Sequence, residues 1–368
     1  MFLPTILALL AGPADAWTPD WSSPATAEVC GRCHRSIHES WKGSAHARAG
    51  ESRLFQDALE MASADSGPTA RKTCLGCHAP VAILAGDENM LRKVSWEGIT
   101  CDYCHSIRDV TLAEPNPKVS ITFSMIKSGP LKDATSMAHG TAYSAIHTSS
   151  LACASCHEYR NSLGFPVLTT YSEWQESSYG KDSVQCQSCH MSRVAGHVVD
   201  PRVKRTSEAK INMHEMPGSH SLTQLTKTIR ASLTAARQPN QVQVFLDVEN
   251  SAAGHRVPTG SPLRKILIDV NAAGPGVNFH EERVYARSVA DQQGKPINSE
   301  HIAFLKAAKL IADTRLRPRE KRRETFTVPA PAGTPLTVRA TLRYFYSPTA
   351  RTEAEQRVTF LILSQYVR

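Results

Sequence analysis

The cysteines of this chain follow one pattern, and a histidine belongs to that pattern each time. All ten cysteines lie in Cys-x-x-Cys pairs, and each of the five pairs is followed directly by His. Two thiols at this spacing can form thioether bonds to the two vinyl groups of a porphyrin, and the adjacent imidazole can bind its iron. We therefore expect five covalently attached haem c groups. The expected attachment residues are Cys30, Cys33, Cys74, Cys77, Cys101, Cys104, Cys153, Cys156, Cys186 and Cys189, and the expected proximal iron ligands are His34, His78, His105, His157 and His190.

Two other uses of paired cysteines fit this pattern less well. A structural zinc site takes two half-sites for each metal, so an odd number of pairs leaves one without a partner. Zinc binding also does not require His directly after each pair. Ten cysteines in an exported chain would ordinarily indicate disulfides, but redox-active disulfides within five Cys-x-x-Cys pairs of one chain would be unusual.

Each iron has a second axial position, and ten further histidines lie outside the motifs. His46, in WKGSAHARA, is expected on a helix of small residues that lets a porphyrin approach the backbone. His139 and His147, in MAHGTAYSAIH, precede the fourth motif among small residues. His214 follows the fifth motif, and His220 is the alternative to it. Five histidine ligands would give low reduction potentials; the histidines expected to be ordinary polar side chains are His38, His197, His280 and His301.

The fifth candidate ligand lies in a different part of the chain. His255 stands in AGHRVPTG, where Gly254 leaves room beside it and Pro258 and Gly260 stiffen the following turn. We expect this loop to supply His255 as a distal ligand to a haem of the neighbouring domain. The alternative is a turn histidine that is hydrogen-bonded to the backbone.

The chain is expected to have an α+β fold with two domains that differ in their sequence patterns. The motifs occupy residues 30–190, where short helices and loops would wrap around haems that replace a conventional core. The later segments VQVFLDV (242–248) and LTVRATLRYFY (336–346) alternate apolar and polar residues, which predicts half-buried strands. Further strands are expected in RKILIDVN, ERVYARSV and RVTFLILSQYV, which together indicate an antiparallel β-sandwich. The expected boundaries are a signal peptide over 1–16, a pentahaem domain over 17–221, a linking helix over 222–239 and the β-sandwich over 240–368.

The N-terminus and the charge bear on location and partners. FLPTILALL followed by ADA resembles a cleaved secretory signal, although it lacks a basic residue before the apolar run; an ordinary apolar segment or a different start codon is the alternative. No other stretch has the length and apolar character of a membrane helix. The formal charge is +8, but haem propionates would remove most of it, so nucleic acid is not expected as a partner. We expect an exported protein, periplasmic or at the cell surface.

Several phrases resemble a known family. CLGCHAPVA, WEGITCDYCHSI, TTYSEWQESSY, CQSCHM, GHRVPTGSPLR and DTRLRPREKR resemble exported multihaem cytochromes c of the c-552/c-554 type. The resemblance runs from about residue 25 to the C-terminus. It implies electron transfer outside the cytoplasm through mostly bis-histidine haems, and some relatives keep one five-coordinate haem.

Three functions remain open at this stage. The favoured one is electron transfer between a redox protein donor and an acceptor. The second is an enzyme that reduces or oxidises small nitrogen or sulfur compounds at one open haem, with Tyr171 and Tyr179 as candidate pocket residues. Pentahaem nitrite reductases typically carry one motif with Lys in place of His, and this chain has none. The third is a homo-oligomer or filament in which one subunit donates a histidine to the next.

Overall fold

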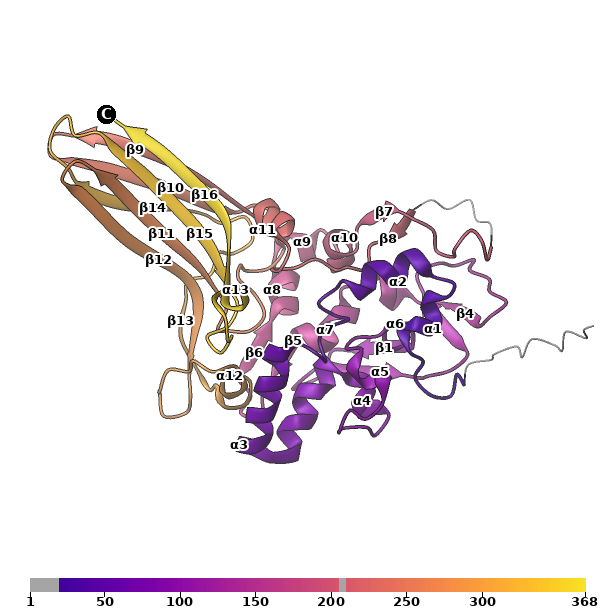
Figure 1. Cartoon of the computed structure of the whole chain (residues 1–368). Helices are drawn as coiled ribbons and strands as arrows, with labels where there is room; N and C mark the ends of the chain where they lie inside the picture. Colours follow the sequence, from indigo (N-terminus) through magenta and orange to yellow (C-terminus); the bar gives the residue numbers. More distant parts are fainter. Residues whose placement is uncertain (1–19, 205–209) are drawn as a thin grey trace, which may run out of the picture.

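The computed structural model describes residues 20–204 and 210–368, and it has the expected α+β fold (Figure 1). Short helices and loops form the N-terminal part, and antiparallel sheets form the C-terminal part. The expected signal peptide over residues 1–16 lies outside the described residues. Within the described residues, no helix combines the length and the apolar character that crossing a membrane requires.

The motifs themselves set where the N-terminal helices end. Four helices stop at a motif histidine, so each places its two cysteines one helical turn apart on the same face. In the first motif, Cys30 lies in one helix and His34 precedes the next. The helices are α1 (Ala27–Gly31), α2 (Arg35–Lys42), α3 (Arg53–His78), α4 (Pro80–Leu84), α5 (Lys93–Trp96), α6 (Cys101–His105), the 3-10 helix η1 (Ala145–Thr148), α7 (Leu151–His157), α8 (Thr170–Glu176), α9 (Ser178–Lys181), α10 (Cys186–His190) and α11 (Leu222–Thr228).

Four two-stranded sheets connect these helices. They pair β1 (Ile107–Thr111) with β2 (Lys118–Ile121), β3 (Ile126–Gly129) with β4 (Gly140–Tyr143), β5 (Glu158–Arg160) with β6 (Pro166–Thr169), and β7 (Arg193–Ala195) with β8 (Lys210–Asn212). Helix α3 is kinked at Gly67 and Pro68, since proline cannot continue the helical hydrogen bonds. The apolar clusters of this part are small, whereas the largest cluster lies wholly in the C-terminal part.

The C-terminal part is a sandwich of two antiparallel sheets, as expected. The strands are β9 (Ile229–Gln238), β10 (Gln241–Asn250), β11 (Lys265–Gly274), β12 (Val277–Ala290), β13 (Lys309–Asp313), β14 (Lys321–Pro329), β15 (Leu336–Phe345) and β16 (Arg357–Val367). One sheet has the order β14-β10-β9 and the other β13-β12-β11-β15-β16. In β10, buried and half-buried residues alternate along all ten positions, so one face packs into the core between the sheets.

The expected linking helix over residues 222–239 is wrong in its second half. Helix α11 ends at Thr228, and β9 begins at Ile229 and pairs along its whole length with β10. Ile229, Ala231 and Leu233 recur at every second residue and point to one face. The neighbouring strand satisfies their backbone groups while that face enters the core, so the sandwich starts about ten residues earlier than expected.

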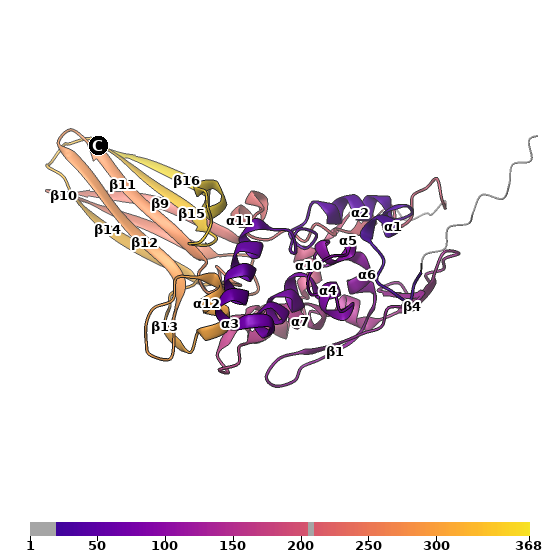
Figure 2. The same ribbon diagram turned by 60° about the horizontal axis from the view of Figure 1, so that its bottom comes forward.

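The two parts contact each other along several elements. Helix α12 (Glu300–Lys306), inserted between β12 and β13, packs against α3, and the views in Figures 1 and 2 agree on this. There Nε2 of His301 forms a hydrogen bond with the carboxylate of Asp65, and the nitrogen and Oδ2 are 2.9 Å apart. Helix α13 (Glu353–Gln356) precedes β16, and just before it Arg351 pairs with Asp57 of α3 at 2.6 Å.

Candidate haem sites

The first four motifs line one continuous cavity of 1760 Å³ in the N-terminal part. All ten cysteines are free thiols and are half-buried. Local hydrogen bonds also fix the conformation of a motif. At the start of α6, the side chain of Thr100 accepts a hydrogen bond from the Tyr103 amide at 3.0 Å. This bond caps the helical turn that carries Cys101 and Cys104. The cavity takes the place that a hydrophobic core would occupy.

Four motif histidines each face a second imidazole at nearly the same distance. The ring centroids are 6.2 Å apart for His34 and His139, 6.2 Å for His46 and His157, 6.5 Å for His105 and His214, and 6.4 Å for His190 and His255. Two imidazoles that each bind one iron through nitrogen at about 2 Å would have centroids about 6 Å apart. The four pairs therefore fit bis-histidine ligation of an iron.

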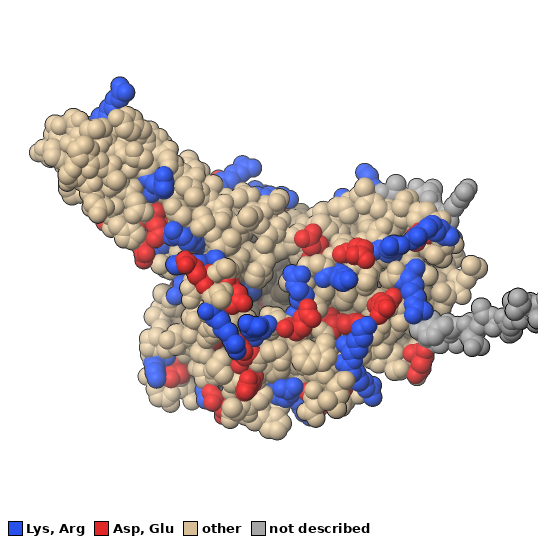
Figure 3. Space-filling model, viewed as in Figure 1, with Lys and Arg blue, Asp and Glu red and all other residues tan. Residues whose placement is uncertain are grey.

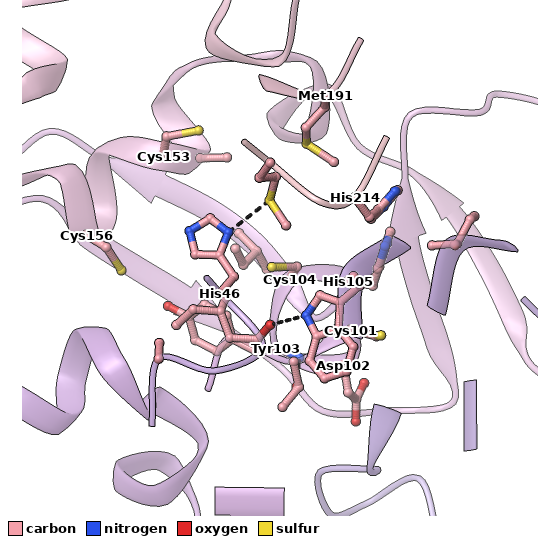
Figure 4. A pocket seen from close by; sticks show the side chains of 18 of the residues that line it. His46, Cys101, Asp102, Tyr103, Cys104, His105, Cys153, Cys156, Met191 and His214 are labelled. Carbon is pink, nitrogen blue, oxygen red and sulfur yellow. Dashed lines mark hydrogen bonds between the residues drawn. The ribbon is translucent and has the colours of Figure 1, made fainter. Parts of the chain in front are cut away.

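Most of these histidines are oriented by a hydrogen bond through the same ring nitrogen. The Nδ1–H group donates to a backbone carbonyl, which leaves Nε2 available to bind a metal. The pairs, with Nδ1···O distances, are His34 with Val198 (2.6 Å), His78 with Ala49 (3.3 Å), His105 with Ser128 (2.6 Å), His139 with Gly140 (2.9 Å), His190 with Pro217 (2.8 Å), His214 with Asn212 (2.6 Å) and His255 with Arg256 (2.9 Å). His46 differs, because its Nδ1 contacts the sulfur of Met216 at 3.0 Å (Figure 4).

Burial keeps these imidazoles in the form that binds a metal. It lowers the pKa of His105 and of His157 to about 3, against an ordinary value of 6.5. The pKa values of His214 and His255 are also lowered, again mainly by burial. A neutral imidazole has a free lone pair, so no proton has to be displaced before it binds iron.

The remaining motif histidine is placed differently. His78 stacks on the phenyl ring of Phe55, with centroids 4.0 Å apart and planes at 6°. All fifteen histidines of the chain lie within the described residues, and in that part of the chain His78 has no imidazole in ring contact. If the second motif holds a haem, its histidine would be an iron ligand with no histidine opposite to it among the described residues.

His147 does not take the place that the sequence suggested. Its ring stacks beside that of His105, with centroids 5.3 Å apart, and its Nε2 contacts the carbonyl oxygen of Cys104 at 3.1 Å. His214 occupies the position at iron-bridging distance from His105, on the same side of the view in Figure 4. The ring of His147 instead stacks beside the ring of the expected ligand His105.

Two further expectations are corrected in detail. His46 lies in a run of turns after α2, not on a helix. Helix α2 ends before Gly43, and the Ser44 hydroxyl accepts a hydrogen bond from the Ala47 amide at 3.0 Å. This side-chain hydrogen bond replaces a backbone hydrogen bond of a helix. His220, the alternative to His214, stacks on Tyr346 of the β-sandwich at 4.3 Å.

Unpartnered polar atoms in the N-terminal part also fit bound haem. Among the described residues, Nδ1 of His147 and Nδ1 of His197 are buried and have no hydrogen-bond partner. Buried polar groups are nearly always paired, so these two nitrogens call for a polar group of a bound molecule. Haem propionates would provide one, and the donor set of paired imidazoles and paired thiols fits the same cofactor.

Thiols of different motifs contact one another, which places the motifs in an order. The thiols of Cys30 and Cys101, of Cys77 and Cys156, and of Cys153 and Cys186 are neighbours that shift each other's pKa values. The charge of Cys156 also raises the pKa of Cys104, although burial, the larger cause, contributes most of a shift to about 12. The first motif therefore lies next to the third, the third near the fourth, and the fourth next to both the second and the fifth.

The loop of His255 is held against the N-terminal part by Glu173, which the sequence did not single out, and by Tyr179, which was expected as a pocket residue. Glu173 of α8 accepts the Arg256 amide at 3.1 Å and contacts the hydroxyl of Thr259 at 3.3 Å. A side chain at Gly254 would meet Tyr179 at 3.1 Å and Trp174 at 3.2 Å, so glycine allows the close approach. Tyr179 thus packs against the loop, and the TTYSEWQESSY phrase positions His255.

Comparisons with known proteins agree with this geometry. Residues 29–106, which contain the first three motifs, match the family described as cytochrome c554 and c-prime. The fold is similar to that of a penta-heme cytochrome c552 from Thermochromatium tepidum, with a TM-score of 0.75 and 22% sequence identity over 93% of this chain and 99% of that one. No curated protein sequence matches the chain.

Two other solved structures align poorly and bear no weight. They are β-glucosidase 3B from Thermotoga neapolitana (TM-score 0.16, 15% identity, 38% of this chain and 16% of that one) and Spo0M from Bacillus subtilis (TM-score 0.15, 11% identity, 38% and 48%). The partial family match and the shared fold agree with the five motifs: the chain is similar to multihaem c-type cytochromes, and the cofactor that both matches support is covalently bound haem c.

Proposed function

We propose that this chain is an exported electron-transfer protein that carries five haem c groups, one on each motif. Each iron would supply a one-electron couple. The single observation that carries the proposal is the set of four imidazole pairs at 6.2–6.5 Å. Paired imidazoles keep both axial positions occupied, which favours electron exchange over substrate binding. The proposed distal ligands are His139, His46, His214 and His255.

The sulfur contacts support a defined order of transfer. Cys30 and Cys101 would hold the edges of the first and third haems together, and Cys153 and Cys186 those of the fourth and fifth. With the third and fourth motifs also near each other, this gives a path through the first, third, fourth and fifth haems. The contact between Cys77 and Cys156 attaches the second haem as a side branch at the fourth.

The surface supports brief encounters with redox proteins. Lys and Arg residues are intermixed with Asp and Glu on the face in Figure 3, and no broad area of one sign is visible there. Such a face does not select a highly charged polymer such as nucleic acid. The proposed partners are an electron donor and an acceptor outside the cytoplasm.

A second candidate function concerns the second haem alone. His78 lacks an opposing imidazole, and the sulfur contacts place its motif at the end of a branch. An iron with an open position at the end of an electron path can reduce a small molecule that binds there. This candidate is a reductase of small nitrogen or sulfur compounds, fed by the other four haems.

Low-temperature EPR of the fully oxidised holoprotein tests both proposals. We expect low-spin signals that integrate to four irons and a high-spin signal that integrates to one. Five low-spin irons would remove the reductase candidate and leave electron transfer in place. Several high-spin irons would contradict the four imidazole pairs.

A rapid-mixing experiment tests electron transfer directly. Oxidised protein is mixed with a substoichiometric amount of dithionite, and the absorbance of the low-spin haems is followed. We expect electrons to redistribute among them within the mixing time, because thiols of neighbouring motifs are in contact. Redistribution over seconds would contradict a continuous path.

A further inference from the structure

The cavity that contains His78 is also lined by polar residues of the β-sandwich. Ser261, Arg264, Glu300 and Tyr346 line it together with the motif residues. Arg264 comes from GHRVPTGSPLR, so one loop carries both the proposed ligand His255 and this arginine. The β-sandwich therefore contributes polar groups to the cavity in addition to one histidine.

Arg264 and His78, the motif histidine without an imidazole partner, line the same cavity. Burial lowers the pKa of His78 to about 4, and the charge of Arg264 contributes to that shift. The same charge contributes to the lowered pKa values of His157 and His220, again after burial. The charge of Arg264 thus acts on three imidazoles that line the same cavity.

Arg264 has hydrogen-bond donors to spare. Within the described part of the chain, its side chain makes one hydrogen bond, from Nη1 to the carbonyl oxygen of Thr259 at 3.2 Å, and no ion pair. A guanidinium carries five N–H donors and keeps its charge at all relevant pH values. The remaining donors of this half-buried side chain have no protein acceptor, which is the condition for binding an anion.

The neighbouring backbone makes room for this arginine. Gly260 has a φ of +87°, and a Cβ atom there would lie 2.8 Å from Nη1 of Arg264. Glycine accepts this backbone conformation without strain, and any side chain would push the guanidinium away. Gly260 and Thr259 therefore hold Arg264 in a set position.

Glu300, a carboxylate that lines the same cavity as Arg264, is hydrogen-bonded to a hydroxyl. Glu300 accepts a hydrogen bond from the hydroxyl of Ser261, and the two side chains of Glu300 and Arg264 form no ion pair in the described structure. Burial raises the pKa of Glu300, which favours its neutral form. The charge of Arg264 acts on Glu300 but is outweighed there by burial, so Arg264 can still interact with a bound anion.

We propose that Arg264 and the iron held by His78 together bind a small inorganic anion. This inference rests on the second candidate function and deepens it by naming the class of ligand and the residue that selects it. The guanidinium would attract the negative charge, while the open axial position would accept a lone pair of the same anion. His220 stacked on Tyr346 and the aromatic side chain of Phe304 would close the cavity around it.

Ligand binding to the purified holoprotein tests this proposal. Azide is titrated into the oxidised protein and followed by the loss of the high-spin absorbance and EPR signals, and carbon monoxide is titrated into the reduced protein. The variants are Arg264→Gln, Arg264→Lys and the matched control Arg339→Gln, which removes an exposed charge on β15. Azide carries a charge and carbon monoxide does not, so the two probes separate charge recognition from access to iron.

We expect Arg264→Gln to weaken azide binding about tenfold or more, the effect of losing a charge-assisted hydrogen bond. Carbon monoxide binding should change less than twofold, Arg264→Lys should restore part of the azide affinity, and Arg339→Gln should match the unaltered protein. A high-spin iron that binds carbon monoxide, with equal azide affinity in all variants, would overturn the proposal. An accompanying shift of a haem potential in Arg264→Gln would then assign Arg264 to a haem propionate.

The experiment distinguishes failure of the reductase candidate from failure of the anion site alone. If the unaltered protein has no high-spin iron and binds neither probe, the reductase candidate fails, and the anion site fails with it. If carbon monoxide binds but azide does not depend on Arg264, the open iron stands and only the anion site is lost.

Discussion

Arg315 and Glu173 form a buried ion pair across the two parts of the molecule, with Nη2 and Oε1 2.8 Å apart. Their side chains are only 5% and 7% exposed. The same carboxylate holds the backbone of the loop that carries His255. The β-sandwich is therefore fixed to helix α8 at the point where a distal ligand would enter the haem region.

Replacement of Glu173 by Gln should loosen this loop. We expect a loss of about 2 kcal/mol in the free energy of unfolding, because Arg315 keeps only Asp313 as a charged partner. A fraction of the iron on the fifth motif should become high-spin in EPR. Glu176→Gln on the same helix is the control, because Glu176 is exposed; equal effects of both variants would contradict the role given to Glu173.

Removal of His255 should open one iron. His255→Ala is expected to convert one low-spin iron to high-spin, and added imidazole should restore the low-spin signal by filling the vacated position. The exposed His280 on β12 serves as control, since its replacement should leave all spin states unchanged. An unchanged spectrum for His255→Ala would remove this residue from the ligand set.

His147 and His214 can be told apart in the same way. His214→Ala should produce a high-spin iron, because its ring lies 6.5 Å from that of His105. His147→Ala should leave the spin states as they are, since its Nε2 faces a carbonyl oxygen. The reverse outcome would restore His147 as the ligand.

A side chain at Gly254 should separate the loop from α8 and α9. Gly254→Val places carbon atoms against Tyr179 and Trp174, where even a Cβ would be only 3.1 Å and 3.2 Å from them. We expect a partial high-spin signal and a destabilisation of about 1–3 kcal/mol from overpacking. Gly43→Val is a fair comparison, because its closest neighbour would lie at 3.9 Å; a silent Gly254→Val would mean that the loop tolerates displacement.

The buried pair of Asp102 and Lys127 should tune the neighbouring irons. Asp102 lies between the cysteines of the third motif with its side chain 0% exposed, and Lys127 is 11% exposed. Asp102→Asn should raise the midpoint potential of an adjacent haem and Lys127→Gln should lower it, each by roughly tens of millivolts for a charge at this range. Spectroelectrochemical titration measures both, and shifts of the same sign in the two variants would contradict the electrostatic explanation.

Acid should remove the contribution of Asp247 to the stability of the sandwich. Its hydrogen bond to Arg323 lowers its folded pKa to about 2, below an ordinary value of 3.8. A depressed folded pKa stabilises the fold above the unfolded pKa, and this stabilisation is lost as the pH falls through about 2. The unfolding free energies of the unaltered protein and Asp247→Asn should thus differ at pH 6 and converge near pH 2; a constant difference would argue against this linkage.

Local patterns in the sequence were sufficient for the cofactor and for most elements. The Cys-x-x-Cys-His spacing depends on one helical turn, and the alternation in residues 242–248 depends on the two-residue period of a strand. Both are properties of neighbouring residues, so they could be predicted without a structure. The apolar residues after Thr228 fit the period of a helix and also that of a strand. The segment forms a strand because β10 supplies the hydrogen-bonding partner for its backbone.

The pairing of histidines was beyond the reach of sequence. Both His147 and His214 are plausible ligands from sequence, and only the tertiary packing decides which ring lies 6.5 Å from that of His105 and which stacks beside it. Arg264 and Glu173 carried no local signal either, since single charged residues in loops are common. Their roles depend on which residues of the N-terminal part the β-sandwich contacts.

The sequence by itself determined the haem c cofactor, five candidate attachment motifs and a strand-rich domain after them, because these features rest on contacts between residues close in the chain. The tertiary structure alone decided which imidazoles face each other, which motif has none opposite it, and which charge shares its cavity. Those relationships join residues such as His190 and His255, whose separation along the chain leaves no periodic trace, and they arise only when the two domains pack together.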